Sequence, residues 1–310
     1  MRHLRSTYMP VLIAVACLLS GCFTGVENTK KITEKDVRKA ESQISATESS
    51  LPPYSDSVPV WQEGKKFYVT DNQVKLIFSS SPSFNIDTLS LAGKILTFTG
   101  YNTGSVLDNR QTVNLHFSDG VNTFVYPSGK TMQDFSHTWN IPFLVNCDEV
   151  EHYARLLTGK DAYIKTSIWY SPQSETMRNG RKFIKVHIDS IVPGNKVFPL
   201  KVIFTPADKS DTAMVWMATS NTVMQGRDFD SMFSMTDIRL QFPSISNANW
   251  QHIVNGEVVK GMTKDECRLA LGVPRQTNNV PTYDGVLEHW YYDGGAYLIF
   301  MDGSLLDFRR

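Results

Sequence analysis

The sequence predicts a β-rich α+β protein. Short runs of branched and aromatic residues, separated by turn residues, fill the chain from Val58 to about residue 243. Only a few short segments show helical spacing, and near the C-terminus two capped helical segments precede three strand-like runs. With 310 residues, of which 41% are hydrophobic, the chain can form two or three domains with cores of their own.

The N-terminus has the pattern of a secretory signal. Arg2 and Arg5 precede the apolar run Val11–Leu19, and no acidic residue occurs before Glu27. At about 1.5 Å per residue this run is too short to cross a hydrocarbon core of about 30 Å. A basic start, a short apolar run and small residues at its end predict a cleaved signal over residues 1–21.

The end of the apolar run, Leu19-Ser20-Gly21-Cys22, resembles the lipobox of bacterial lipoproteins. The resemblance implies cleavage between Gly21 and Cys22 and attachment of diacylglycerol to the Cys22 thiol. The alternative is an ordinary buried helix that happens to contain this cysteine. Two or three acyl chains, at about 0.8 kcal/mol per buried methylene, would hold the mature protein on its membrane.

The residue that follows Cys22 indicates the membrane to which the protein is sorted, and the net charge of the mature chain restricts the kinds of partner that it can bind. Phe23, and no acidic run, follows Cys22. By resemblance to Gram-negative sorting signals, this implies the outer membrane with the protein facing the periplasm. Removal of residues 1–21 leaves 29 basic and 31 acidic residues. This balance excludes the basic surface that nucleic-acid binding requires.

Residues 22–56 are predicted to form a lipidated, solvated tether with a short helix. Thr33 and Asp36 can cap the helix, whose apolar positions are Ile32, Val37, Ala40 and Ile44. Ser49–Pro53 ends any such helix. We expect the tether to reach outward and the C-terminal domain to lie farthest from the lipid.

A first β-module is expected over residues 57–146. Val113, Leu115 and Phe117 alternate with polar residues, which predicts one buried and one solvated face. The predicted strands are Lys66–Thr70, Val74–Phe78, Ile95–Thr99, Thr112–Phe117 and Asn122–Tyr126.

A second module, with a connecting helix over Cys147–Leu157, is expected over residues 147–243. Its strands repeat the order of the first module, with an insertion at Ser171–Arg181, and a helical turn follows at Phe229–Phe233. Two related small antiparallel β-modules similar to SH3-like barrels would explain the repeat. Chance similarity between hairpins would explain it as well.

Residues 244–310 are predicted to form an ααβββ domain. Ser246 or Asn249 can cap the first helix, and Thr263 with Glu266 forms a capping box for the second. A polar loop follows, and then three strands joined by tight glycine turns: Leu287–Tyr292, Ala296–Phe300 and Leu305–Phe308.

These residues resemble the BamE (SmpA/OmlA) family. The resemblance lies in Gly261-Met262-Thr263, Leu271-Gly272-Val273-Pro274, Trp290-Tyr291-Tyr292 and Phe300-Met301-Asp302-Gly303. It implies a small outer-membrane lipoprotein fold that assists the machine inserting β-barrels, although that family lacks the β-modules expected here. The whole chain is also similar to large lipoproteins of Bacteroides-type bacteria, from which no activity follows. That likeness lies in Gly21–Glu27, Thr29–Thr33 and Gly261–Cys267.

Motifs of catalysis are missing from the sequence. It contains no His-Glu-x-x-His, no Walker loop, no Gly-x-Ser-x-Gly and no Gly-x-Gly-x-x-Gly. No catalytic, cofactor-binding or metal-binding residue is therefore predicted. Cys147 and Cys267 are expected either as buried thiols or as a disulfide. Trp169, Tyr170 and Trp216 are candidates for partner binding or sugar stacking, although strand aromatics more commonly belong to the core.

We therefore expect a non-enzymatic, lipid-anchored envelope lipoprotein that acts as an interaction or assembly adaptor for an envelope protein. Two alternatives stay open at this point. One is a lipoprotein that binds peptidoglycan or another glycan through the β-modules. The other is an envelope hydrolase whose site forms only in three dimensions.

Replacement of Cys22 by alanine removes the thiol to which the predicted diacylglycerol is attached. We expect radiolabelled palmitate to be incorporated into the wild type and lost completely from Cys22→Ala. Equal labelling of both chains would contradict the lipobox.

Overall fold

The structure, a computed structural model, describes residues 28–31, 51–105, 110–135, 137, 139–208, 211–219, 226–283 and 285–309. The predicted cleavage site, Cys22 and the short helix after Ile32 lie outside the described residues. The chain divides into two compact units, residues 41–256 and residues 257–310 with the first 40 residues. Antiparallel sheets with a few short helices confirm the β-rich α+β class.

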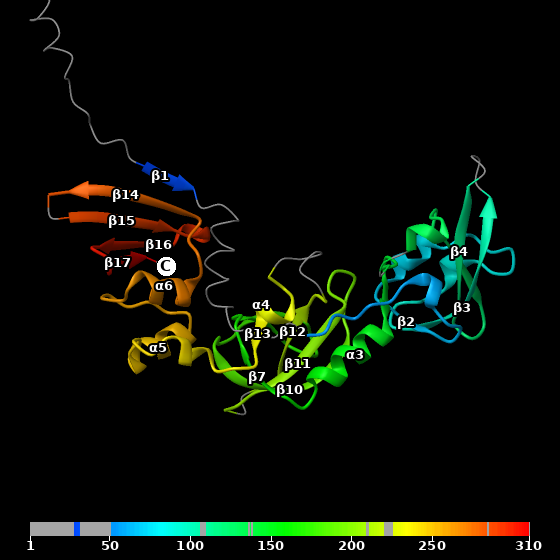
Figure 1. Ribbon diagram of the computed structural model, residues 1–310, viewed down its shortest axis with the longest axis horizontal. Coiled ribbons are helices and arrows are strands. Elements are labelled where there is room, and N and C mark those ends of the chain that lie inside the picture. The colour runs from blue at the N-terminus through cyan, green and yellow to red at the C-terminus, as the bar shows by residue number, and fades with distance from the viewer. Residues whose placement is uncertain are drawn as a thin grey trace, which may run out of the picture. The chain divides into compact units, whose positions relative to one another are not determined.

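The first sheet of the larger unit has the strand order β5-β4-β3-β2-β6, and its strands β2, β3 and β4 are labelled in Figure 1. As the alternation predicts, Val113, Leu115 and Phe117 are fully buried. The ring of Phe117 lies 5.4 Å from that of Phe67 and 5.9 Å from that of Phe98. The strands are β2 (Lys66–Val69), β3 (Ile95–Ser105), β4 (Gln111–Ser118), β5 (Thr123–Pro127) and β6 (Leu144–Asn146).

The strand expected over Val74–Phe78 is wrong. This segment lies in the 3-10 helix η2 (Asn72–Ile77), which begins where the Asp71 carboxylate accepts a hydrogen bond from the Gln73 amide at 2.7 Å. Val74 and Phe78 are buried, whereas Leu76 is 82% exposed. The apolar residues thus have the spacing of a helical turn. The Asp71 cap favours this turn over the strand that the short apolar run predicted.

The second sheet has the order β13-β7-β10-β11-β12-β8-β9. Its first five strands, β13-β7-β10-β11-β12, are connected in the same way as β6-β2-β3-β4-β5 of the first sheet. The two added strands are β8 (Ile168–Tyr170), which ends just before the expected insertion Ser171–Arg181, and β9 (Met177–Asn179), which lies within it. The others are β7 (Asp161–Ile164), β10 (Ile184–Pro193), β11 (Leu200–Pro206), β12 (Ala213–Met217) and β13 (Phe233–Ser234).

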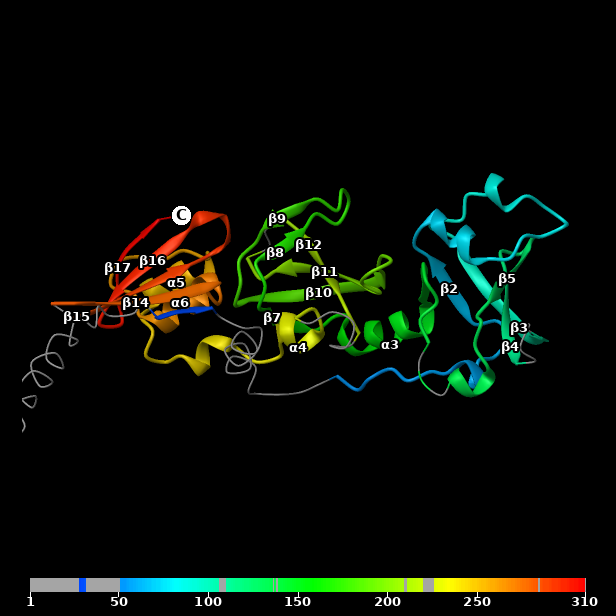
Figure 2. The same cartoon turned by 90° about the horizontal axis from the view of Figure 1, so that it is seen from above.

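Three helices accompany these sheets. Helix α3 (Cys147–Leu157) has the predicted bounds and runs between the two sheets (Figure 2). The predicted turn forms α4 (Phe229–Met232), and α5 (Asn247–Val254) begins after the predicted cap Ser246. We expected α5 within the C-terminal domain, but it belongs to the larger unit. Its Trp250 lies 5.8 Å from the ring of Phe183 and 4.9 Å from the Arg239 guanidinium.

A buried ammonium group links the first sheet to α3. Lys65 Nζ lies 2.8 Å from Asp56 and 2.5 Å from Asp148, and the lysine side chain is only 6% exposed. The rings of Tyr54, Trp61 and Phe67 surround the same nitrogen at 5.8–5.9 Å. Burial alone would lower the pKa of Lys65, but the hydrogen bonds to Asp148 and Asp56 outweigh it and raise the pKa above its usual value.

The C-terminal unit contains one sheet, β1-β14-β15-β16-β17, with helix α6 (Lys264–Leu271) against one face (Figure 1). The three predicted strands correspond to β15 (Gly285–Tyr291), β16 (Tyr297–Met301) and β17 (Ser304–Arg309). The loop expected before them forms β14 (Gln276–Thr282), whose sequence of polar residues and proline gave no strand signal.

The sheet also includes β1 (Asn28–Lys31), which pairs antiparallel with β14. These four residues were expected in a solvated tether. Backbone hydrogen bonding to a polar strand needs no apolar side chains. The hydrophobic pattern of the sequence therefore could not predict that β1 is a strand. Part of the expected tether is therefore the edge strand of the C-terminal sheet.

Lys65→Met should lower the free energy of unfolding by about 3 kcal/mol, because the Asp56 carboxylate, 10% exposed, loses its cation. Urea denaturation measures the change. The neighbouring Lys66 is exposed, and Lys66→Met should stay within about 0.5 kcal/mol of the wild type. Because the pKa of Lys65 is raised, its contribution should persist at neutral pH and disappear as the pH rises through that folded-state pKa. Equal effects of the two substitutions would contradict the role of Lys65.

Candidate functional site

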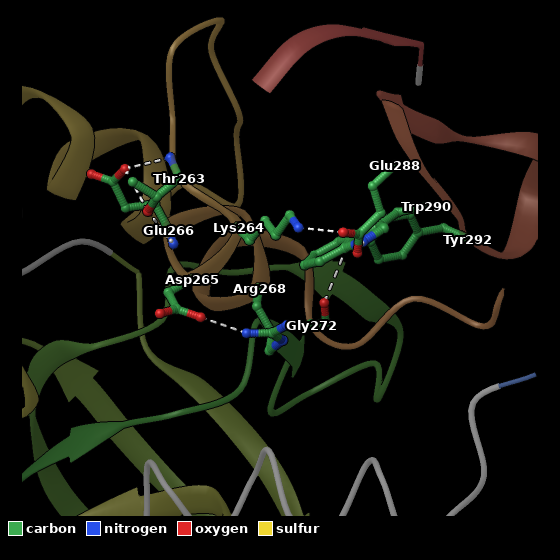
Figure 3. Close-up of polar contacts among 9 residues, drawn as sticks. All are labelled: Thr263, Lys264, Asp265, Glu266, Arg268, Gly272, Glu288, Trp290 and Tyr292. Carbon is green, nitrogen blue, oxygen red and sulfur yellow. Dashed lines mark hydrogen bonds and ion pairs between the residues drawn. The ribbon is translucent and has the colours of Figure 1, made fainter. Parts of the chain in front are cut away.

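Four of the motif residues, Thr263, Gly272, Trp290 and Tyr292, lie at the two ends of α6 and at the end of β15 (Figure 3). Thr263 caps α6, and the Glu266 carboxylate accepts a hydrogen bond from the Thr263 amide at 2.8 Å. The predicted capping box is therefore confirmed. Arg268 lies one turn further along the helix and pairs with Asp265 at 2.5 Å. These contacts fix the first turn of the helix.

Glu288 of β15 connects the helix to the sheet (Figure 3). Its carboxylate pairs with Lys264 and accepts a hydrogen bond from Trp290 Nε1 at 2.6 Å. The Trp290 ring lies 5.0 Å from the Arg268 guanidinium and 4.7 Å from the ring of Phe300. Trp290 thus packs between α6 and the sheet. Its contacts with Arg268, Glu288 and Phe300 stabilise the C-terminal unit.

The remaining motif groups are also internal. The Tyr292 hydroxyl donates to the Gly272 carbonyl at 3.3 Å, and burial raises the pKa of Tyr292. Burial raises the pKa of Cys267, in the middle of α6, to about 12. A thiol with such a pKa is not a nucleophile at neutral pH. The motif residues of the C-terminal unit therefore form helix caps, a turn and packing contacts.

The three aromatic candidates of the second sheet belong mostly to its core. Trp169 is 4% exposed, donates to the Thr166 carbonyl at 2.9 Å and packs edge-on against Phe204 at 5.2 Å. Trp216 is 8% exposed and lies below the Lys201 ammonium at 5.6 Å. Tyr170 is half-buried, with its ring 6.4 Å from that of Trp216. Neither tryptophan presents the open ring face that a sugar needs for stacking.

A cavity of about 200 Å³ lies elsewhere in the larger unit. It is bounded by the approach to β6, the first turn of α3, the β10–β11 loop and the end of β12. The residues that line the cavity include Thr70, Phe143, Glu149, Lys196, Val197 and Thr219. This cavity could not be predicted from the sequence, because its walls come from four separate parts of the chain.

Two rigid turns shape the cavity. Phe143 has a positive φ of 65°, and its carbonyl accepts hydrogen bonds from the amide and the hydroxyl of Thr70 at 2.9 and 3.1 Å. In the β10–β11 loop, Gly194 donates to the Pro199 carbonyl at 2.8 Å, and a side chain at Gly194 would collide with the Phe198 carbonyl. These hydrogen bonds hold both loops in defined conformations, so the cavity is preformed.

Glu149 provides the acidic group of the cavity. It sits in the first turn of α3, which Asn146 caps by accepting a hydrogen bond from the Asp148 amide at 3.1 Å. Glu149 is 7% exposed, and desolvation raises its pKa although a hydrogen bond from Thr219 opposes the shift. A carboxyl with a raised pKa can both donate and accept hydrogen bonds in a mildly acidic environment.

No group of three or more histidine, cysteine or acidic side chains in the described residues could hold a metal ion. Cys147 and Cys267 are free thiols, so the disulfide alternative is not realised in this structure. Within the described ranges, no helix is long and apolar enough to span a bilayer. Comparison of the chain with protein-family models, curated proteins and solved structures finds no match.

Glu149→Gln should raise the thermal unfolding temperature at neutral pH, because the neutral amide avoids the desolvation cost of the carboxylate. The folded-state pKa lies above the usual 4.5. Protonated Glu149 therefore favours folding below the unfolded pKa, and this contribution is lost as the pH rises through the folded pKa. The difference from the wild type should disappear below about pH 4. A variant less stable at pH 7 than at pH 4, relative to the wild type, would contradict this account.

Proposed function

We propose that the protein is a lipid-anchored, non-enzymatic adaptor of the bacterial outer membrane, facing the periplasm, whose cavity receives one side chain of a partner protein. The preformed cavity is the observation that carries the proposal. Its volume of about 200 Å³ is suited to one large side chain and is small for a cofactor.

The chemistry of the cavity favours a polar anchor residue on the partner. Glu149 offers a buried hydrogen-bonding group at one side, and Lys196 and Val197 lie in the loop opposite. A partner amide or hydroxyl could hydrogen-bond to the Glu149 carboxyl while its apolar part packs against the loop. Buried anchors of this kind contribute most of the affinity of typical protein interfaces.

The adaptor is built, in this proposal, from two SH3-like modules. Their shared connectivity supports it: the last strand of each pairs with the first, as in β6-β2 and β13-β7. A short helix precedes the last strand in both modules, η4 (Met132–Phe135) before β6 and α4 before β13. The matching order makes duplication a better explanation than chance similarity between hairpins.

The C-terminal unit completes the adaptor as a BamE-like module. The capping box at Thr263, the turn at Gly272 and the contact between Trp290 and Phe300 support this assignment. They support the fold of the unit and no particular partner. Anchoring through Cys22 would keep the whole adaptor at the membrane where its partner resides.

Site-specific photo-crosslinking in native membranes tests the proposal. A photoreactive residue at Val197, which lines the cavity and is 40% exposed, should form one reproducible adduct with a partner. The same residue at Leu240, which is 77% exposed and lies in η5 (Ile238–Gln241), away from the residues lining the cavity, serves as the control. It should give no such adduct.

The Glu149→Gln variant sharpens the test, because it keeps the size of the side chain and changes only its charge and hydrogen bonding. Adduct yield at Val197 should fall in this variant, while the protein remains folded and membrane-bound. Identical adducts at Val197 and Leu240, or none at Val197, would overturn the adaptor proposal.

A further inference from the structure

The exposed tip of the β14–β15 hairpin is the least protected apolar feature of the C-terminal sheet. Tyr283 is fully exposed, at 104% of its reference area, and Val286 is 49% exposed. Residues 281–287 of the tip contain one charged residue, the acidic Asp284, and no basic residue. Tyrosine with a neighbouring aliphatic side chain is suited to the boundary between headgroups and acyl chains of a membrane.

The register of β1 places this tip relative to the predicted lipid. Asn28, at the start of β1, pairs with Asn279, and the strands are antiparallel. The chain preceding Asn28 therefore leaves the sheet at the end where the β14–β15 hairpin turns. Tyr283 lies four residues beyond Asn279, so the tip extends about 13 Å past Asn28 in that same direction.

The available chain length is short. Cys22 precedes Asn28 by six residues, which span at most about 20 Å when fully extended. An acyl-bearing Cys22 would therefore hold the Asn28 end of the sheet within about 20 Å of the bilayer. The opposite end, at the turn containing Asp293, lies about 17 Å from Asn279 in the other direction.

We infer that the C-terminal unit rests on the membrane, with the Tyr283 tip of the β14–β15 hairpin in contact with the lipid surface. This inference rests on the lipid anchor of the proposed function. It corrects the expectation that the unit lies farthest from the lipid, because β1 joins the unit to the anchored end of the chain. The partner is a neutral lipid interface, since the tip contains the acidic Asp284 and offers no cation to anionic headgroups.

Fluorescence quenching of the lipidated full-length protein in phosphatidylcholine vesicles tests the contact. A Cys147→Ser background leaves Cys267, which is fully buried, as the remaining thiol of the folded domains. An NBD probe is attached at Tyr283→Cys or, as the matched control, at Asp293→Cys, whose side chain is 82% exposed. Vesicles with a headgroup spin label should quench the probe at 283 and leave the probe at 293 unquenched.

Disulfide trapping tests the strand that sets the geometry. Thr29→Cys with Asn278→Cys, and separately Lys30→Cys with Thr277→Cys, place cysteines at two neighbouring pairs of the ladder. One of two such neighbours is a non-hydrogen-bonded pair with closely spaced Cβ atoms, so at least one disulfide should form.

The outcomes separate this inference from the function on which it rests. Quenching at 283 alone, with a trapped disulfide, supports the membrane contact. A lipidated, vesicle-bound protein that shows no quenching at 283, equal quenching at both positions, or no disulfide overturns the contact and leaves the adaptor proposal intact. A wild-type chain without lipid removes the anchor, and both proposals fail together.

Discussion

The larger unit depends on one buried ammonium group. Lys65 Nζ contacts Asp56 from the segment before the first sheet and Asp148 from α3, while three aromatic rings enclose it. A desolvated cation is tolerated only where anions and hydrogen-bond acceptors surround it. The requirement fixes the start of α3 against β2 and thereby the position of Glu149, one residue after Asp148. The ion pairs of Lys65 with Asp56 and Asp148 therefore help to position the wall of the cavity that Glu149 forms.

Local signals predicted the helices well. The capping box at Thr263 and the cap at Ser246 gave correct starts, and α3 has its predicted bounds because Asn146 and Gly159 flank an amphipathic run. These are contacts between residues at most a few positions apart, so the sequence contains the whole interaction. The same reasoning failed at Val74–Phe78, where an apolar run too short to show a period formed a turn.

Pairing between distant segments was much harder to predict. Strand β14 is polar and β1 resembles a linker, because their contribution to the sheet comes from backbone hydrogen bonds that no side-chain pattern records. The cavity could not be predicted for a related reason. Its lining residues have no distinctive local sequence and come together only in the folded protein: Thr70, Phe143, Glu149 and Val197. Two of the aromatic candidates for partner binding, Trp169 and Trp216, are nearly buried, in agreement with the more common core role of aromatic residues in strands.

Strand β1 also constrains the order in which the chain folds. Asn28 and its partner Asn279 lie about 250 positions apart, and closing so long a flexible loop costs about 5 kcal/mol of chain entropy. Prior folding of residues 41–256 would replace most of that loop by a compact body and reduce the cost. Strand β1 is therefore among the last elements to fold, although it is synthesised early. It stays unpaired until β14, near the C-terminus, has been synthesised.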